Sequence, residues 1–404
     1  MNAAQIDFRP FLTVDAGWDN GLNGVSIDPN GNPVNVSGVS VDASLGLSGL
    51  HSWKHTTLGL DYRGGARHNT RNSFYDGFNQ SLLFGVTHML TRHVALSLHQ
   101  STGITSQGFA PPTLQQTVPF DPSTAYTPTN TFFDNRTVYF SSQADLQVQR
   151  STRMSFDIGG SFFLTRFRST ALYGDTGVGA HGDLQYRVSR DGTLGATYSY
   201  SHYTFRGIFS STDVHSAGLT YALRMSRTVE MSMIVGVARF ETKFEQDVPI
   251  DPAVAAIIGA GTAKRVSYNL GYTPSFTARI SKTIPRGVLF LSGARTIMPG
   301  NGLFLTSKST AITGGYSYTG LKRWGISATA SEIYSNSISN VVGQYSSFIV
   351  GGSISREIMR SVHGVFGFNA SKYGSGDFRN YNKWTYSVHA GLGFTPGDIP
   401  IRLW

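Results

Sequence analysis

The sequence predicts an all-β fold: a single transmembrane, antiparallel, up-and-down β-barrel of about 18 strands, with about 16 as the alternative. Three observations predict this class. Apolar and polar residues alternate along segments that recur about every 22 residues from end to end. The connections between these segments alternate between short turns and long loops. Only 14% of the residues are charged, against about 25% in an average soluble protein.

Alternation of period two gives each strand one face for lipid and one for water. Residues 134–149 separate apolar from polar positions cleanly, whereas residues 286–297 and 303–318 do not. No apolar run approaches the roughly 20 residues that a membrane helix needs. A membrane span in this chain therefore requires a closed barrel, in which every backbone group is paired. We expect strands near residues 8–18, 36–52, 55–66, 77–89, 92–104, 134–149, 152–165, 174–188, 192–205, 212–226, 228–243, 265–281, 286–297, 303–318, 322–334, 342–357, 361–372 and 381–395.

The last segment carries a terminal signature. Every second residue from Tyr386 to Phe394 is apolar, and after a short Pro/Gly tail the chain stops on Trp404. With the short turns, many of which bear arginine, this ending resembles the bacterial outer-membrane β-barrels of the porin type found in Gram-negative cells. The resemblance implies a multi-pass barrel in outer-membrane lipid, with the short turns in the periplasm. It also implies that Phe394 and Trp404 form the assembly signal for the barrel assembly machinery.

The resemblance also bears on the domain organisation. We expect residues 1–404 to form one barrel domain with no plug domain before the first strand, unlike the TonB-dependent transporters. The first residues lack the basic and apolar regions of a secretion signal. We therefore expect the numbering to begin near the mature N-terminus. The five tryptophans lie near segment ends, as in the aromatic girdles of membrane barrels, which disfavours a soluble β-sandwich or propeller.

The polar faces of the segments predict which side chains line the lumen. With a net charge of +9 and a pI near 9.6, the chain is expected to favour anions at its mouths. Other basic residues fall in short turns, where they solvate the hairpins: Arg92, Arg150, Arg153, Arg190, Arg227 and Lys322. The pore-lining residues that we expect to matter most are Arg63, Arg67, Asp145, Arg187, Arg224, Arg279, Lys383 and His389.

Two long connections are too apolar for ordinary solvated loops. Residues 105–133 contain five prolines and several aromatic residues, which predicts a constriction inside the barrel or a lid on its rim. Residues 249–261 form a second apolar loop, which we expect to tuck into the mouth or to contact a partner.

Several kinds of chemistry are excluded or unsupported. Cysteine is absent, so disulfides and thiolate sites are excluded. The Gly177–Gly182 match to a dinucleotide-binding pattern lies inside a strand with no helix after it, so we expect its glycines to leave space in the lumen or to permit strand bending. His99 with Ser101, and Asp175 or Asp213 with a nearby histidine, have spacings that chance explains. We predict no catalytic residue, no metal site and no cofactor, and no nucleic-acid partner, because the positive charges are not gathered in one patch.

The sequence therefore predicts a channel, not an enzyme, which passes hydrophilic, anionic solutes or polymers through a basic polar lumen. Two alternatives remain open. A barrel of about 18 strands with a basic lumen is similar to the exit barrels that export acidic exopolysaccharides, which would work with periplasmic export proteins. A non-conducting barrel used for adhesion or as a scaffold, with its lumen blocked by residues 105–133, is the other.

Overall fold

The computed structural model describes residues 4–22, 36–70, 76–105, 136–170, 172–253, 257, 259, 261–299, 302, 305–318, 320–321, 323–338, 343–375, 384–397 and 399–403. The proposed constriction at 105–133, apart from Thr105, and the residues Lys383, Lys322 and Trp404 lie outside these ranges. In the described ranges, no helix is long and apolar enough to cross a membrane.

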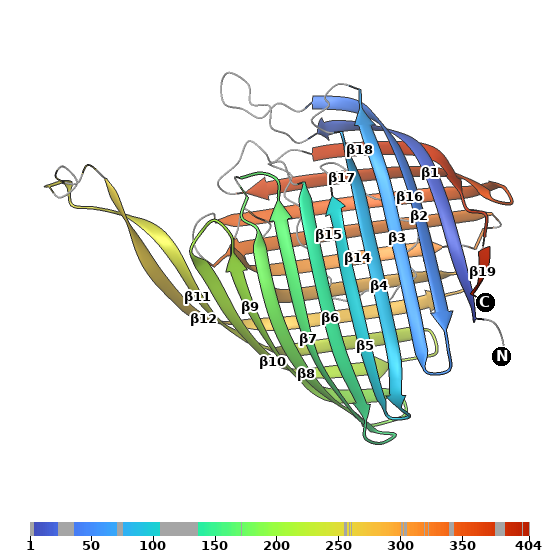
Figure 1. The fold of residues 1–404 in the computed structure, drawn as a ribbon, viewed down its shortest axis with the longest axis horizontal. Coiled ribbons are helices and arrows are strands. Elements are labelled where there is room, and N and C mark those ends of the chain that lie inside the picture. The colour runs from blue at the N-terminus through green and yellow to red at the C-terminus, as the bar shows by residue number, and fades with distance from the viewer. Residues whose placement is uncertain are drawn as a thin grey trace.

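The chain forms a closed antiparallel barrel of 18 strands, each hydrogen-bonded to the strands before and after it in sequence (Figure 1). Closure comes from β1 pairing with β18, so that both ends of the chain meet in one ladder. The strands are β1 (Ala4–Leu22), β2 (Val36–Ser52), β3 (Thr56–Asn69), β4 (Gly77–Thr91), β5 (Val94–Thr105), β6 (Thr137–Gln149), β7 (Met154–Phe167), β8 (Asp175–Arg187), β9 (Gly192–Phe205), β10 (Ser210–Arg224), β11 (Val229–Pro249), β12 (Thr262–Ile284), β13 (Gly287–Pro299), β14 (Thr306–Tyr318), β15 (Trp324–Ser337), β16 (Gln344–Met359), β17 (Val362–Ser375) and β18 (Trp384–Phe394).

The predicted barrel of about 18 strands is confirmed, and every expected segment coincides with a strand. The tail is a correction. Residues expected to be a Pro/Gly tail form a short strand, β19 (Ile399–Leu403), which pairs with Ala4–Phe8 of β1. Sequence reasoning missed it because proline is disfavoured in strands. Pro400 is tolerated here in a strand of five residues that pairs on one side, with β1.

The two faces of the wall differ as the alternation predicts. On β1, Leu12, Val14 and Trp18 point outward and are about half exposed, whereas Thr13 points inward and is buried. Paired residues of neighbouring strands share a face, so the ladder carries this assignment round the barrel and back to β1 without a break. An apolar outer wall on a closed barrel is what lipid requires, and the protein is a multi-pass barrel of the bacterial outer membrane.

Tryptophans mark both rims of this wall. Trp18 and Trp384 lie at the end that carries the long connections, and Trp53 and Trp324 lie at the end that carries the short turns. All four are exposed, as interfacial aromatic residues are in membrane barrels. The long connections face the outside of the cell and the short turns face the periplasm, which is also where both ends of the chain lie.

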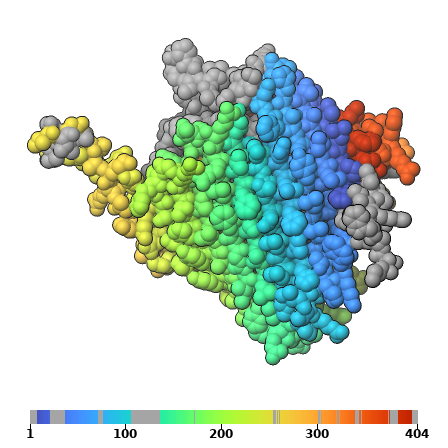
Figure 2. Space-filling model, in the orientation of Figure 1, coloured from blue at the N-terminus to red at the C-terminus, as the bar shows by residue number. Residues whose placement is uncertain are grey.

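One hairpin departs from the barrel outline. Strands β11 and β12 pair with each other without interruption from Val229 to Pro249, and the ribbon that they form projects beyond the extracellular rim (Figures 1 and 2). The described residues of the apolar loop, 249–253, 257, 259 and 261, lie at its tip, where Ile257 is 84% exposed. The expectation that this loop tucks into the mouth is therefore wrong, because the uninterrupted ladder carries it away from the barrel.

The wall also splits between β12 and β13. Their ladder runs from Ile284 and Gly287 up to Phe276 and Arg295, and then stops. Continuing it would place Pro274 opposite Ile297 and Pro299 opposite Tyr272, and proline has no N–H to contribute. Above this level, in the part of the chain that the structure describes, β12 pairs only with β11 and β13 only with β14.

Candidate functional site: the barrel lumen

The strand register fixes where each predicted pore-lining residue lies. The seven that fall in the described ranges occupy inward positions, but on six different strands, so the barrel does not gather them into one site. Arg187 and Arg224 lie at the periplasmic ends of β8 and β10. The inward set is Arg63, Arg67, Asp145, Arg187, Arg224, Arg279 and His389.

Arg67 is held by a carboxylate on the neighbouring strand. The β2–β3 register places Arg67 opposite Asp42, and the guanidinium binds both carboxylate oxygens, at 2.6 and 2.7 Å. Both side chains are about nine-tenths buried. Asp15, which pairs with Asp42, and Asp19 also interact electrostatically with Arg67. Three carboxylates therefore surround this guanidinium, which leaves it poorly suited to bind a passing anion.

A second charged group lies on β6, β7 and β8, nearer the periplasm. His181 Nε2 is 3.4 Å from Asp145 Oδ1, 3.9 Å from Asp157 Oδ1 and 4.0 Å from Asp183 Oδ2. Gln143 donates a hydrogen bond to Asp145. These three strands thus present a carboxylate patch to the lumen around one imidazole. Among the described residues this is where a divalent cation could be held, because ligand atoms of Asp145, Asp157 and His181 lie within 4.8 Å of one another.

We expected a basic lumen, and the strands that the structure describes show a different balance of carboxylates and guanidinium groups, with Lys383 outside the described residues. The basic turn residues Arg92, Arg150, Arg153, Arg190 and Arg227 lie in the periplasmic turns, so much of the net positive charge is outside the barrel. Within the described strands, inward carboxylates outnumber inward guanidinium groups. The carboxylates are Asp15, Asp19, Asp42, Asp61, Asp145, Asp157, Asp175, Asp183, Glu230 and Glu357, and the guanidinium groups are Arg9, Arg63, Arg67, Arg187, Arg224 and Arg279.

Inward glycines let large rings lie against the wall. A Cβ atom at Gly46 would lie 2.2 Å from the ring of Phe11, and one at Gly177 would lie 2.1 Å from the ring of Phe163. Both rings therefore cover a cross-strand glycine, a packing that stabilises glycine in sheets. The Gly177–Gly182 segment lies within β8, where Gly177 and Gly179 occupy inward positions and Gly182 an outward one. The same arrangement recurs at Phe240 over Gly271, Phe290 over Gly315 and His389 over Gly367.

The extracellular mouth is narrowed by part of the wall itself. We call residues 295–299, 302 and 305–310, where β13 ends and β14 begins, the β13–β14 end. Thr306 Oγ1 lies 2.8 Å from Thr212 Oγ1 on β10, and Lys308 Nζ lies 4.8 Å from the ring centre of Phe240 on β11. Gly302 accepts a backbone hydrogen bond from Tyr173, just before β8, at 3.0 Å. The β13–β14 end therefore lies against the inner surface of β10 and β11 and reaches the residues just before β8.

An apolar cluster fills the space between these two layers. Ile297 and Leu305 come from the β13–β14 end, and both are almost completely buried. Sequence reasoning missed this constriction, although it left two signals: the prolines at 274 and 299, and the unclear alternation of residues 286–297 and 303–318. The remaining members of the cluster come from β9 to β11 and from the residue after β15: Tyr203, Phe205, Val214, Ala238, Phe240 and Ile338.

The two acids considered for catalysis, Asp175 and Asp213, lie on different faces of the wall. Asp213 and His215 point outward from β10, where Asp213 accepts a hydrogen bond from Tyr200 Oη at 2.7 Å and lies 2.8 Å from His202 Nδ1. Asp175, in contrast, points inward from β8. Asp213 and His215 therefore face lipid or the outer rim, whereas Asp175 faces the lumen.

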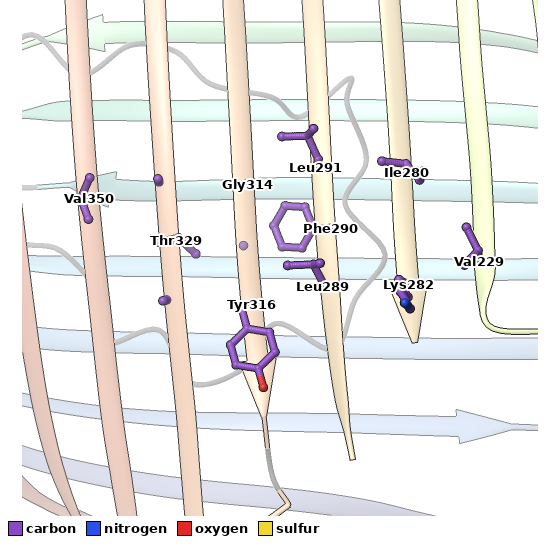
Figure 3. A pocket seen from close by; sticks show the side chains of 13 residues that line it. Val229, Ile280, Lys282, Leu289, Phe290, Leu291, Gly314, Tyr316, Thr329 and Val350 are labelled. Carbon is purple, nitrogen blue, oxygen red and sulfur yellow. The ribbon is translucent and has the colours of Figure 1, made fainter. Parts of the chain in front are cut away.

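A groove of about 660 Å³ lies on the membrane side of the wall (Figure 3). Leu289, Leu291 and Ile280 form one side of it and Val350 the other, around Gly314 on β14. These five are outward positions in the ladder. The groove is therefore a feature of the lipid-facing wall, not of the channel.

Comparison with known proteins adds little beyond the class of fold. No protein-family model matches the sequence, and no curated protein matches it. The structure is similar to OccK5 (OpdH) of Pseudomonas aeruginosa, with 13% identity, 98% of each chain covered and a TM-score of 0.45. It is similar to OpdQ of the same species, with 9% identity, 99% of each chain covered and a TM-score of 0.46. The ferric-catecholate import receptor Fiu of E. coli matches with 9% identity and a TM-score of 0.47, over 98% of this chain and 82% of that one. At these values the likeness assigns no function.

Proposed function

We propose that the protein is a passive channel of the outer membrane that passes hydrophilic solutes through its lumen. One observation carries this proposal: the closed wall is apolar outside and lined inside by charged, amide and hydroxyl side chains. A barrel of about 18 strands is wide enough to enclose water unless protein fills it. Permeation through such a lumen needs no catalytic residue, and selectivity comes from the pore radius and the inward charges.

The sign of the preferred solute follows from the inward charges. The sequence predicts a preference for anions from the net charge of +9. Against that, the inward carboxylates outnumber the guanidinium groups, and Arg67 and Arg63 are each paired with an aspartate, at 2.6 and 2.8 Å. A wall with this balance raises the local concentration of cations. We therefore propose that cationic or zwitterionic hydrophilic solutes pass more readily than anions.

Planar-bilayer recording of the refolded protein under a salt gradient tests both the proposed channel and its proposed preference for cations. Steady openings support the channel, and their reversal potential gives its sign. A cation-selective reversal potential supports the role of the inward carboxylates. An anion-selective reversal potential would mean that the basic residues, not the carboxylates, determine the selectivity. Silence after insertion has been confirmed would contradict the channel itself.

A second candidate, an adhesion or scaffold barrel, is favoured by the projecting β11–β12 hairpin. Tyr268 and Tyr272 on this hairpin are 70% and 67% exposed, which suits contact with another surface. The exopolysaccharide alternative gains no such support, because an acidic polymer would meet the carboxylates of the lumen. Deleting the hairpin tip should abolish surface binding if adhesion is the function, and should leave conductance unchanged if the protein is a channel.

A further inference from the structure

The contacts of the β13–β14 end follow the facing wall strand by strand. Lys308 reaches Phe240 on β11, Thr306 reaches Thr212 on β10, and Gly302 reaches the backbone just before β8. Between these points, Ile297 and Leu305 pack with the apolar residues of β9 to β11. The segment therefore runs along the inner surface of the barrel from β11 to β8.

The alternation of the strands shows which layer lies inside. Ile297, Thr306 and Lys308 share the outward face with Leu289 and Leu291 lower on β13. They nevertheless touch inward positions of β10 and β11. An outward face can meet an inward face only if the β13–β14 end lies on the lumen side of β10 and β11. Packed sheets lie about 10 Å apart, so the doubled wall takes about that much from the width of the mouth.

We propose that the β13–β14 end is the size filter of the extracellular mouth, and that Ile297, Leu305 and Thr306 are the residues that hold it in the narrowing position. This inference rests on the proposed channel function. Hydrophilic solutes too wide for the doubled-wall mouth are excluded, whatever their charge. The two prolines that end the β12–β13 ladder are what frees this part of the wall to fold inward.

Side chains, not a strand ladder, join the two layers. Thr212, Thr242 and Thr306 form a hydrogen-bonded group with no exposed surface, and the apolar cluster lies beside it. Within the described residues, no ladder joins β13 or β14 to β10 or β11. Substitutions in this interface can therefore release the β13–β14 end while the ladders that close the barrel stay intact.

The first test replaces the apolar contacts by polar ones. The double variant Ile297→Ser, Leu305→Ser should release the β13–β14 end. We expect a larger single-channel conductance and passage of larger neutral polymers, measured by exclusion of polyethylene glycols of increasing size. The matched control is Ile312→Ser, at an outward, half-exposed position lower on β14, which should change neither quantity.

A disulfide lock shows whether a wider mouth in the double variant is caused by release of the β13–β14 end. The chain has no cysteine, so Thr212→Cys with Thr306→Cys introduces a single pair, at positions whose side-chain oxygens are 2.8 Å apart. Added to the double variant, this pair should restore the native conductance and exclusion size on oxidation and lose them again on reduction. The control pair Ser309→Cys with Ser335→Cys joins β14 to β15 within one layer, where the oxygens are 3.2 Å apart, and should restore neither.

A labelling experiment reports docking without any current. Val214 on β10 is a member of the apolar cluster and is 5% exposed, so a Val214→Cys variant should react slowly with a maleimide and faster once Ile297 and Leu305 are replaced. The filter alone is overturned by the following set of results. The native protein conducts, the inserted double variant shows the faster labelling of Val214→Cys, and yet its conductance and exclusion size are unchanged. Failure of the oxidised lock to restore the native values also overturns it. A native protein that inserts and stays silent overturns the proposed channel, and the filter with it.

Discussion

Thr306 Oγ1 lies 2.8 Å from Thr212 Oγ1, although Thr306 occupies an outward position on β14 and Thr212 an inward position on β10. The third hydroxyl, of Thr242, lies 3.1 Å from that of Thr212, and none of the three side chains is exposed. Buried hydroxyl groups need such partners because no water reaches them. The outer face of one part of the wall thus packs on the inner face of another, and polar contacts fix the overlap.

Thr212→Val removes the hydroxyl that the other two share. The valine has a similar shape, so we expect the main loss to be the unsatisfied hydroxyls of Thr242 and Thr306. Leaving a buried donor without a partner costs about 1–3 kcal/mol. The unfolding free energy in detergent should fall by about that amount, as read by urea titration of tryptophan fluorescence. Thr329→Val, at an exposed inward position on β15, is the control and should be nearly neutral.

Arg67→Ala should destabilise the barrel far more than Arg63→Ala. Removing Arg67 leaves Asp42 buried without its partner and beside Asp15, and breaking a buried pair costs about 3–5 kcal/mol. Arg63 binds Asp61 at 2.8 Å, but both side chains are about a third to a quarter exposed, and exposed pairs contribute about 0–1 kcal/mol. Equal losses in the two variants, measured as midpoints of urea unfolding, would contradict this account of the lumen.

Neutralising the carboxylate patch should move selectivity toward anions. Asp157→Asn with Asp183→Asn removes two inward negative charges on β7 and β8 and preserves the size of the side chains. Reversal potentials under a KCl gradient measure the shift. Glu332→Gln is the control, because Glu332 is exposed on the outward face of β15, between Ile312 and Phe348. A shift of the same size in the control would mean that the patch does not act on the permeating ion.

Gly46→Ala should displace the ring of Phe11. The added carbon would lie 2.2 Å from that ring and 2.8 Å from the backbone oxygen of Tyr62, so both the ring and the backbone must move. Overpacking of this kind costs about 1–3 kcal/mol. Gly182→Ala is the control, because a Cβ atom at Gly182 would meet no heavy atom within 4 Å other than those of its own chain neighbours. Thermal unfolding in detergent should separate the two variants, with only the first losing stability.

Asp76 gives the extracellular end of β3 a dependence on pH. The backbone N–H of Asn69 donates a hydrogen bond to Asp76 at 2.7 Å, and this contact, helped by His68, lowers the pKa of the carboxyl below its ordinary value. A lowered folded-state pKa stabilises the fold at any pH above the ordinary value, and the contribution is lost as the pH falls through the lowered one. The difference in melting temperature between the native protein and Asp76→Ala should therefore shrink toward acid pH. A difference that grows there would show that the ionised carboxylate is not what stabilises this end.

The alternation of the sequence predicts the strands because most of them have lipid on one face and water on the other. The exceptions have a physical cause. The β13–β14 end touches protein on the face that elsewhere meets lipid, so its outward positions need not be apolar throughout. The doubled wall accounts in this way only for the ends of the two ambiguous segments, 295–297 and 305–310, because residues 287–294 pair with β12 in the single wall.

Period two also places Arg67 and Asp42 on inward faces, but it does not pair them. Their contact depends on the β2–β3 register, in which a one-residue slip would send one of them to the lipid face. The net charge does not describe the lumen alone, for a related reason. It sums the turns with the wall, and the arginines of the periplasmic turns lie outside the space through which a solute passes.

The split between β12 and β13 also sets how deeply the barrel is immersed. Their ladder holds nine residue pairs, up to Phe276 and Arg295, and a tilted strand of about 9–11 residues crosses the hydrocarbon. Above this level, among the described residues, no strand pairs with the edge of β12 that faces β13, and hydrocarbon does not tolerate a strand edge without a ladder partner. The outer boundary of the hydrocarbon must lie at or below that pair. On β11 the residue level with Phe276 is Val235, and the outward residues change from Val237 to Arg239 and Glu241 just above it. Backbone pairing and side-chain polarity therefore place the outer boundary of the hydrocarbon within a few residues of each other.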